Sequence, residues 1–136
     1  MAFSDSGTGR IIENGSGLVK VTLAEACRAG DILGYSSGWK RALATVGTAI
    51  QGRLVAGEDG ASGDVITAYR RAVVGNYAGG TPGGAVYVAE GTDYGKITDT
   101  APNTTNDCNT IIGYLVTATE AALEPGSRAA SVAVAR

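Results

Sequence analysis

The chain has 136 residues, with 11 basic and 13 acidic side chains and no histidine, and its length suits one domain with its own hydrophobic core. The net charge of −2 argues against nucleic acid as a partner, because proteins that bind nucleic acid usually present a basic face. The lack of histidine excludes Ser-His-Asp triads and histidine metal ligands, so we expect neither enzymatic activity nor a cofactor.

Residues 1–17 are polar and rich in glycine and serine. We expect them to form an extended arm outside the domain, about 55 Å long when fully stretched. Ile11 and Ile12 form its apolar pair and are its candidate contacts with a partner. The alternative is a disordered tail, since polar termini often lack fixed structure. The first residues have no signal-peptide regions, and no apolar run reaches the roughly 18 residues of a membrane helix.

The first half of the domain is expected to be a series of short strands separated by glycine-containing turns. The run from Asp31 to Ala44, with Ser36-Ser37-Gly38 at its centre, is typical of a β-hairpin. Residues 24–29 permit a short helical turn that Gly30 ends. The expected strands of this half are 18–23, 31–35, 39–44, 48–56 and 64–74.

The strand at 64–74 is the longest, and neither of its faces is purely apolar. Val65, Thr67, Tyr69 and Arg71 share one face by period-two alternation. Tyrosine and arginine are enriched where protein subunits meet. We therefore predict that Tyr69 and Arg71 contact a partner or a second copy of the chain.

Residues 75–84 are expected to link the two halves, with the glycine-rich segment 79–84 at the centre of the linker, and residues 100–109 to form a polar loop. Residues 119–126 are expected to be a loop or a single helical turn. The expected strands are 85–89, 96–98, 111–118 and 129–135.

Three landmarks of the first half recur in the second half in the same order, which indicates a duplicated β unit. Ala29–Tyr35 is echoed by Pro82–Val88, and Ile50–Val55 by Ile111–Val116. The third pair is the glycine turn at 60–67 and the segment 125–134. The sequence thus predicts a single domain over residues 18–136, with pseudo-repeats at about 18–75 and 76–136. Its fold class would be all-β, a small barrel or a jelly-roll-like sandwich.

The acidic, cysteine and aromatic residues are further candidate functional sites, and each also has a purely structural interpretation. Glu58, Asp59 and Asp64 could hold a hard cation, but acids are common in solvated turns. Cys27 and Cys108 fall at different points of the two repeats, and we expect free thiols. The aromatic side chains could form a sugar-stacking platform or pack the core and its rim. They are Trp39, Tyr35, Tyr69, Tyr77, Tyr87, Tyr94 and Tyr114.

Five segments give the chain a resemblance to a family of small tailed-bacteriophage capsid decoration proteins, also called cement proteins. They are Ala29-Gly30-Asp31-Ile32-Leu33-Gly34, Gly52-Arg53-Leu54-Val55, Ser62-Gly63-Asp64-Val65-Ile66-Thr67, Gly83-Gly84-Ala85-Val86-Tyr87-Val88 and Ile112-Gly113-Tyr114-Leu115-Val116. The resemblance spans residues 18–136. It implies a β-rich barrel that oligomerises and sits on the outer surface of a virion, bracing junctions between major capsid protein subunits.

On this interpretation the protein is made in the cytoplasm of a bacterial host and ends on the outer capsid surface. Its partners are the major capsid protein and itself, as a homotrimer or alternatively a homodimer, with no nucleic acid and no membrane. A carbohydrate-binding β module is the alternative function, and an enzyme domain is a third that the missing histidine disfavours.

Overall fold

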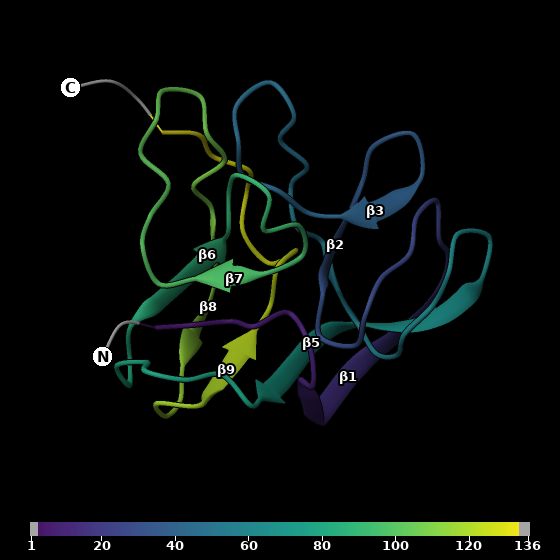
Figure 1. Cartoon of the computed structure of the whole chain (residues 1–136), viewed down its shortest axis with the longest axis horizontal. Coiled ribbons are helices and arrows are strands. Elements are labelled where there is room, and N and C mark those ends of the chain that lie inside the picture. Colours follow the sequence, from purple (N-terminus) through teal and green to yellow (C-terminus); the bar gives the residue numbers. More distant parts are fainter. Residues whose placement is uncertain (1–2, 134–136) are drawn as a thin grey trace.

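The computed structural model describes residues 3–133 and shows an all-β chain without a helix in that range (Figure 1). A strongly curled antiparallel sheet of nine strands forms a half-barrel, which confirms the expected fold class. Within the same residues there is no helix that could span a membrane. The strands are β1 (Ile11–Thr22), β2 (Ile32–Tyr35), β3 (Trp39–Arg41), β4 (Leu54–Ala56), β5 (Val65–Gly75), β6 (Ala85–Val88), β7 (Ile97–Thr98), β8 (Ile111–Leu115) and β9 (Glu120–Leu123).

The order of the strands is symmetric about the centre of the sheet. It runs β3-β2-β4-β5-β9-β8-β6-β7, with β1 added to β5. The pairings β2–β3, β2–β4 and β4–β5 of the first half recur as β6–β7, β6–β8 and β8–β9. Both halves therefore share one connectivity, as expected of a duplicated unit. Whether they superpose atom by atom stays a prediction.

The echoed residues do not all occupy equivalent places in this arrangement. Leu33 of β2 pairs with Leu54, whereas Val86 of β6 pairs with Gly113. The alignment made from the sequence would have paired Val86 with Leu115, so it is wrong by two residues at β8. The third echo is also wrong, because the turn at 60–64 precedes β5 but residues 125–127 follow β9.

The N-terminal residues differ most from the expected arrangement. Residues 11–17 are not an arm but the first half of β1, which pairs with β5 along its whole length, from Ile11 opposite Gly75 to Thr22 opposite Val65. Ser4 bridges to Ala78, so the preceding residues are also held in the fold. The prediction of a separate arm is therefore wrong for residues 3–17, and residues 1 and 2 lie outside the described range. Polar residues suit β1 because most of its side chains face water.

Two expectations near the C-terminus also need correction. Residues 120–123, expected in a loop or helical turn, form strand β9 between β5 and β8. The strand expected at 129–135 is reduced, in its described part, to a single bridge between Val132 and Cys108. Residues 134–136 lie outside the described range. The helical turn considered at 24–29 is absent, and Cys27 there bridges to Gly60.

The core consists of two clusters of buried side chains. The larger joins both halves and includes Ile32, Val55, Val74, Val86 and Ile112. The smaller lies under β1, β2, β4 and the first part of β5, and it includes Leu33 and Ile66. Burying one such side chain contributes about 1.5–3 kcal/mol, so the shared cluster fixes the two halves as one body.

Two pairs of carboxyl groups join segments that lie far apart in the chain. Glu13 of β1 crosses over Gly75 of β5, where a Cβ atom would collide with its carboxyl group, and reaches Glu120 of β9. Glu90 lies beside Asp107, whose Oδ1 atom accepts from the Val46 amide at 2.8 Å. The interaction within each pair raises the pKa of Glu13 and of Glu90 and lowers the pKa of Asp107.

We expect the raised pKa values of Glu13 and Glu90 to make the protein more stable as the pH falls from 7 towards 4.5, the ordinary pKa of a glutamate. A raised pKa in the folded state adds stability at low pH that is lost as the pH rises through that pKa. No histidine titrates in this window. Urea unfolding at pH 7, 6 and 5 measures the effect. Glu13→Gln and Glu90→Gln should be more stable than the wild type at pH 7 and less sensitive to pH, and an unchanged pH dependence would contradict this.

Candidate functional site

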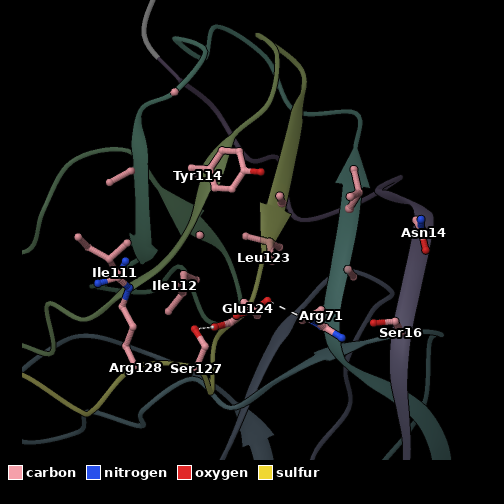
Figure 2. Close-up of a pocket in the computed structure, with 16 residues that line it drawn as sticks. Asn14, Ser16, Arg71, Ile111, Ile112, Tyr114, Leu123, Glu124, Ser127 and Arg128 are labelled. Carbon is pink, nitrogen blue, oxygen red and sulfur yellow. Dashed lines mark hydrogen bonds and ion pairs between the residues drawn. The ribbon is translucent and has the colours of Figure 1, made fainter.

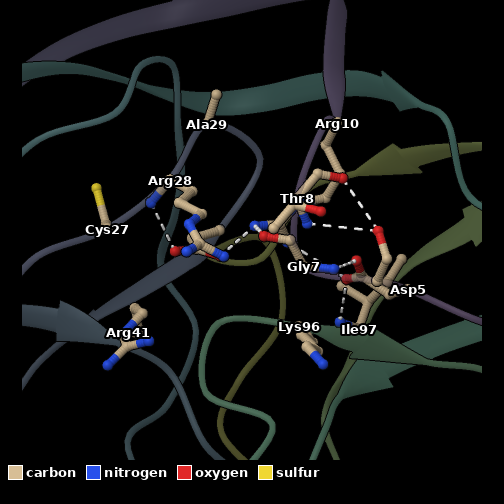
Figure 3. A network of polar contacts seen from close by, with 12 residues as sticks. Asp5, Gly7, Thr8, Arg10, Cys27, Arg28, Ala29, Arg41, Lys96 and Ile97 are labelled. Carbon is tan, nitrogen blue, oxygen red and sulfur yellow. Dashed lines mark hydrogen bonds and ion pairs between the residues drawn. The ribbon is translucent and has the colours of Figure 1, made fainter.

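A buried cluster of ion pairs holds the N-terminal residues against the rest of the molecule (Figure 3). Arg10, whose side chain is 0% exposed, donates from Nη1 to Asp5 at 3.3 Å and from Nη2 to Asp31 and to the Gly7 carbonyl. The Asp5 carboxylate also accepts from the Ile97 amide of β7 at 3.0 Å. These contacts join residues 5–10 to the turn before β2 and to β7, so this segment cannot reach out to a distant partner.

The electrostatics of this cluster depend on all three charges. Burial alone would lower the pKa of Arg10, but Asp31 and Asp5 outweigh it and the pKa is raised. Burial raises the pKa of Asp31, while Arg10 and the Arg28 amide oppose the shift. A charge left alone at such a site is strongly unfavourable. The cluster therefore acts as a structural fastening.

The outer face of the sheet is hollowed into a groove of about 560 Å³ across β1, β5, β9, β8 and β6 (Figure 2). Its floor is a row of directly paired residues. Ala85 pairs with Tyr114, Tyr114 with Ala122, Ala122 with Val73, and Val73 with Asn14. The side chains are small except for Tyr114, which is 54% exposed. This groove provides a mostly apolar contact surface on rigid strands.

Charged side chains line one end of the groove. Figure 2 shows the charged residues Arg71, Glu124 and Arg128 there, together with Ser127. Arg71 Nε forms an ion pair with Glu124 Oε1 at 3.7 Å. A second hollow, of about 480 Å³, shares Arg71, Glu124 and Ser127 and continues the groove to two further arginines. These additional residues are Arg53 and Arg70.

The four residues predicted as contacts differ in their accessibility. Ile11 is 58% exposed, but Ile12 packs against the core and offers no free anchor. Tyr69 is half-buried, with its ring where Cβ atoms on Gly15 and Gly57 would lie at 2.7 Å. Arg71 is exposed and lies on the groove. That any of them contacts a partner stays a prediction.

Sequence reasoning considered Tyr114 only as a member of an aromatic platform and did not select Arg128. The structure places both on the same groove. The signal for Tyr114 was its alternation with the buried Leu115, which places the two side chains on opposite faces of β8. Arg128 carried no signal, because it follows β9 in an irregular segment. Only the pairing of distant strands brings these residues together.

A separate aromatic pair lies at the end of the β2–β3 hairpin. Tyr35, 66% exposed, meets Trp39 edge-on with ring centroids 5.5 Å apart. Arg41 lies over the ring of Tyr94 at 5.3 Å. Tyr77, by contrast, is buried and packs against Phe3. The expected aromatic platform is therefore divided between the core and two exposed places.

The acidic side chains Glu58, Asp59 and Asp64 stabilise the backbone of the turn and its neighbours through hydrogen bonds. The carboxylates accept hydrogen bonds from three different backbone amides. Glu58 accepts from Thr67, Asp59 from Ala29, and Asp64 from Ala61. Among residues 3–133 no group of three cysteine, aspartate or glutamate side chains is placed to hold a metal ion.

Cys27 and Cys108 are both buried free thiols, in agreement with the expectation from the sequence. Burial raises the pKa of the Cys27 thiol to about 11, and Cys108 Sγ donates to Gln51 Oε1 at 2.7 Å. Since thiolates are the reactive form, we expect a thiol reagent such as Ellman's to label the native protein slowly at pH 8. Unfolding in guanidinium should expose two thiols at once, and rapid labelling of the folded protein would contradict this prediction.

Compared with protein-family models, with curated proteins and with solved structures, the chain matches none.

Proposed function

We propose that the protein is a capsid decoration protein, which binds the outer surface of a phage head and stabilises contacts between major capsid protein subunits. The observation that carries this is the groove with its apolar floor on the outer face of a rigid sheet. A large exposed aromatic side chain on such a surface is typical of a protein–protein contact. The sequence resemblance described above favours the phage capsid as the partner.

The fastened N-terminus changes how such a protein would hold its target. The contact would be made by a rigid face and not by a flexible arm, so little conformational entropy is lost on binding. A homotrimer, or alternatively a homodimer, would present several grooves at once. Several weak contacts in one assembly then act together through their high effective concentration.

The test is co-sedimentation with purified undecorated phage heads, using two tyrosine variants. We expect Tyr114→Ala to weaken binding at least tenfold, because a tyrosine at the centre of an interface often contributes about 2 kcal/mol. Tyr35→Ala removes another exposed tyrosine, which lies away from the groove, and should bind like the wild type. Binding that is lost equally in both variants, or in neither, would count against the groove as the contact.

A carbohydrate-binding module is a second candidate, favoured by the exposed Tyr35 beside the partly buried Trp39. Sugar rings stack on such aromatic faces. Trp39 is the chain's one tryptophan, so its fluorescence reports directly on ligands at this place. Saturable fluorescence changes with a glycan, abolished in Tyr35→Ala and kept in Tyr114→Ala, would favour this function over the first.

A further inference from the structure

We infer that the groove and its arginine-lined extension bind an extended protein segment that alternates apolar and acidic side chains. The inference rests on the proposed function in one respect: that function identifies the protein that carries this segment as the major capsid protein. It adds the chemistry of the contact, which follows from the strand pairing, the glycines and the charges around the groove.

The arginines meet where β5 changes its neighbour. β4 pairs with β5 only up to Tyr69, and β9 begins to pair at Ala72. Arg70 and Arg71 therefore have no strand beside them on that edge, and the second hollow opens there. Gly17 lies across from Arg70 and helps to keep this second hollow open. A Cβ atom on residue 17 would lie 2.9 Å from the Arg70 side chain.

The net charge of the side chains around the arginines is positive, whereas the net charge of the whole chain is negative. Arg53, Arg70, Arg71 and Arg128 with Glu124 sum to +3. Since the whole chain carries −2, the remainder carries −5. Among the described residues only Arg71 of the four arginines forms an ion pair, and that pair is long and exposed. Three guanidinium groups are thus available for carboxylates, which they bind in a bidentate geometry.

The apolar floor and the arginines together select one kind of occupant. The floor crosses five strands, about 19 Å at the usual strand spacing, which matches roughly six residues of extended chain. Such a segment would place alternate side chains on Val73, Ala122 and Tyr114 and its carboxylates near the arginines. Nucleic acid fits less well, because a longer polyanion would meet the negative remainder of the surface.

Fluorescence anisotropy with labelled eight-residue peptides tests the inference without phage heads. One peptide alternates valine with aspartate, and its control alternates valine with asparagine. We expect the aspartate peptide to bind at least tenfold more tightly at low salt, with a difference that shrinks as salt screens the charges. Equal binding of the two peptides, or no binding of either at millimolar concentration, would overturn the inference.

Charge reversal locates the contact. The double variant Arg71→Glu, Arg128→Glu should reduce binding of the aspartate peptide at least tenfold. Two single charge reversals serve as controls. Arg28→Glu lies outside the groove and should bind the aspartate peptide like the wild type. Arg71→Glu alone lies inside the groove and should bind with an affinity between those of the wild type and the double variant. Arg28 is exposed and lies outside both hollows. If the double reversal does not fold, as judged by circular dichroism, Arg71→Gln with Arg128→Gln replaces it. Unchanged binding in the folded variant would refute the assignment.

Three further outcomes test the inference and the proposed function separately. A single-stranded oligonucleotide that binds more tightly than the aspartate peptide, with the same dependence on Arg71 and Arg128, would overturn a protein segment as the occupant. Peptide binding without any binding to phage heads would contradict the decoration function and leave the inference standing. Equal binding of the wild type and the double variant to phage heads would support the decoration function. It would also show that the groove is not the surface that contacts the head.

Discussion

Replacing Arg10 by alanine is expected to lower the free energy of unfolding by about 3–5 kcal/mol. The substitution leaves Asp5 and Asp31 buried with no cation between them. It also removes the donor to the Gly7 carbonyl. Small domains are stable by only about 5–15 kcal/mol, so the loss would remove much of the stability of the fold.

Urea unfolding followed by circular dichroism measures this loss. Arg71→Ala is the matched control, since its ion pair with Glu124 is exposed and such pairs contribute about 1 kcal/mol or less. Arg10→Met combined with Asp5→Asn and Asp31→Asn removes all three charges and should recover part of the stability. Similar losses for Arg10→Ala and Arg71→Ala would show that the buried cluster is not a fastening.

The strands with local signals were predictable from the sequence. The hairpin of β2 and β3 has a polar, glycine-containing turn after the apolar run of β2, and β5 alternates over most of its length. β9 was missed because Glu120-Ala121-Ala122-Leu123 consists of good helix formers. Its strand conformation comes from pairing with β5 on one side and β8 on the other. This is tertiary context overriding local propensity.

The groove and the buried ion pairs were not predictable, because each depends on contacts between distant residues. Asp5 and Arg10 look like ordinary charges of a polar terminus until Asp31 and the Ile97 amide come beside them. Sequence polarity suggested an arm, although a polar strand on the sheet and a buried ion pair give the same composition. For the groove, Arg71 was identified from the alternation of β5, but its neighbours come from four other strands and the segment after β9.

Deleting residues 1–17 is expected to prevent stable folding. An independent arm could be removed and leave the domain folded, with only its hold on a partner weakened. In the structure the deletion removes Arg10, the Ser4–Ala78 bridge and the part of β1 that pairs with residues 71–75 of β5. It leaves Asp31 buried without its cation. The combined loss exceeds that of Arg10→Ala and approaches the whole stability of a typical domain.

Circular dichroism, size-exclusion chromatography and amide hydrogen exchange would measure the effect of the deletion. We expect a chain that lacks cooperative unfolding and loses exchange protection in β5, which is the central strand. A second variant separates the two causes by replacing residues 4–10 with glycine and serine at the same length while keeping β1. Because it retains the pairing of β1 with β5 but lacks Asp5 and Arg10, its stability should lie between the wild type and the deletion. If the deleted chain unfolds cooperatively at the wild-type midpoint, the N-terminal residues are an arm after all, and the fastening described here has no role in stability.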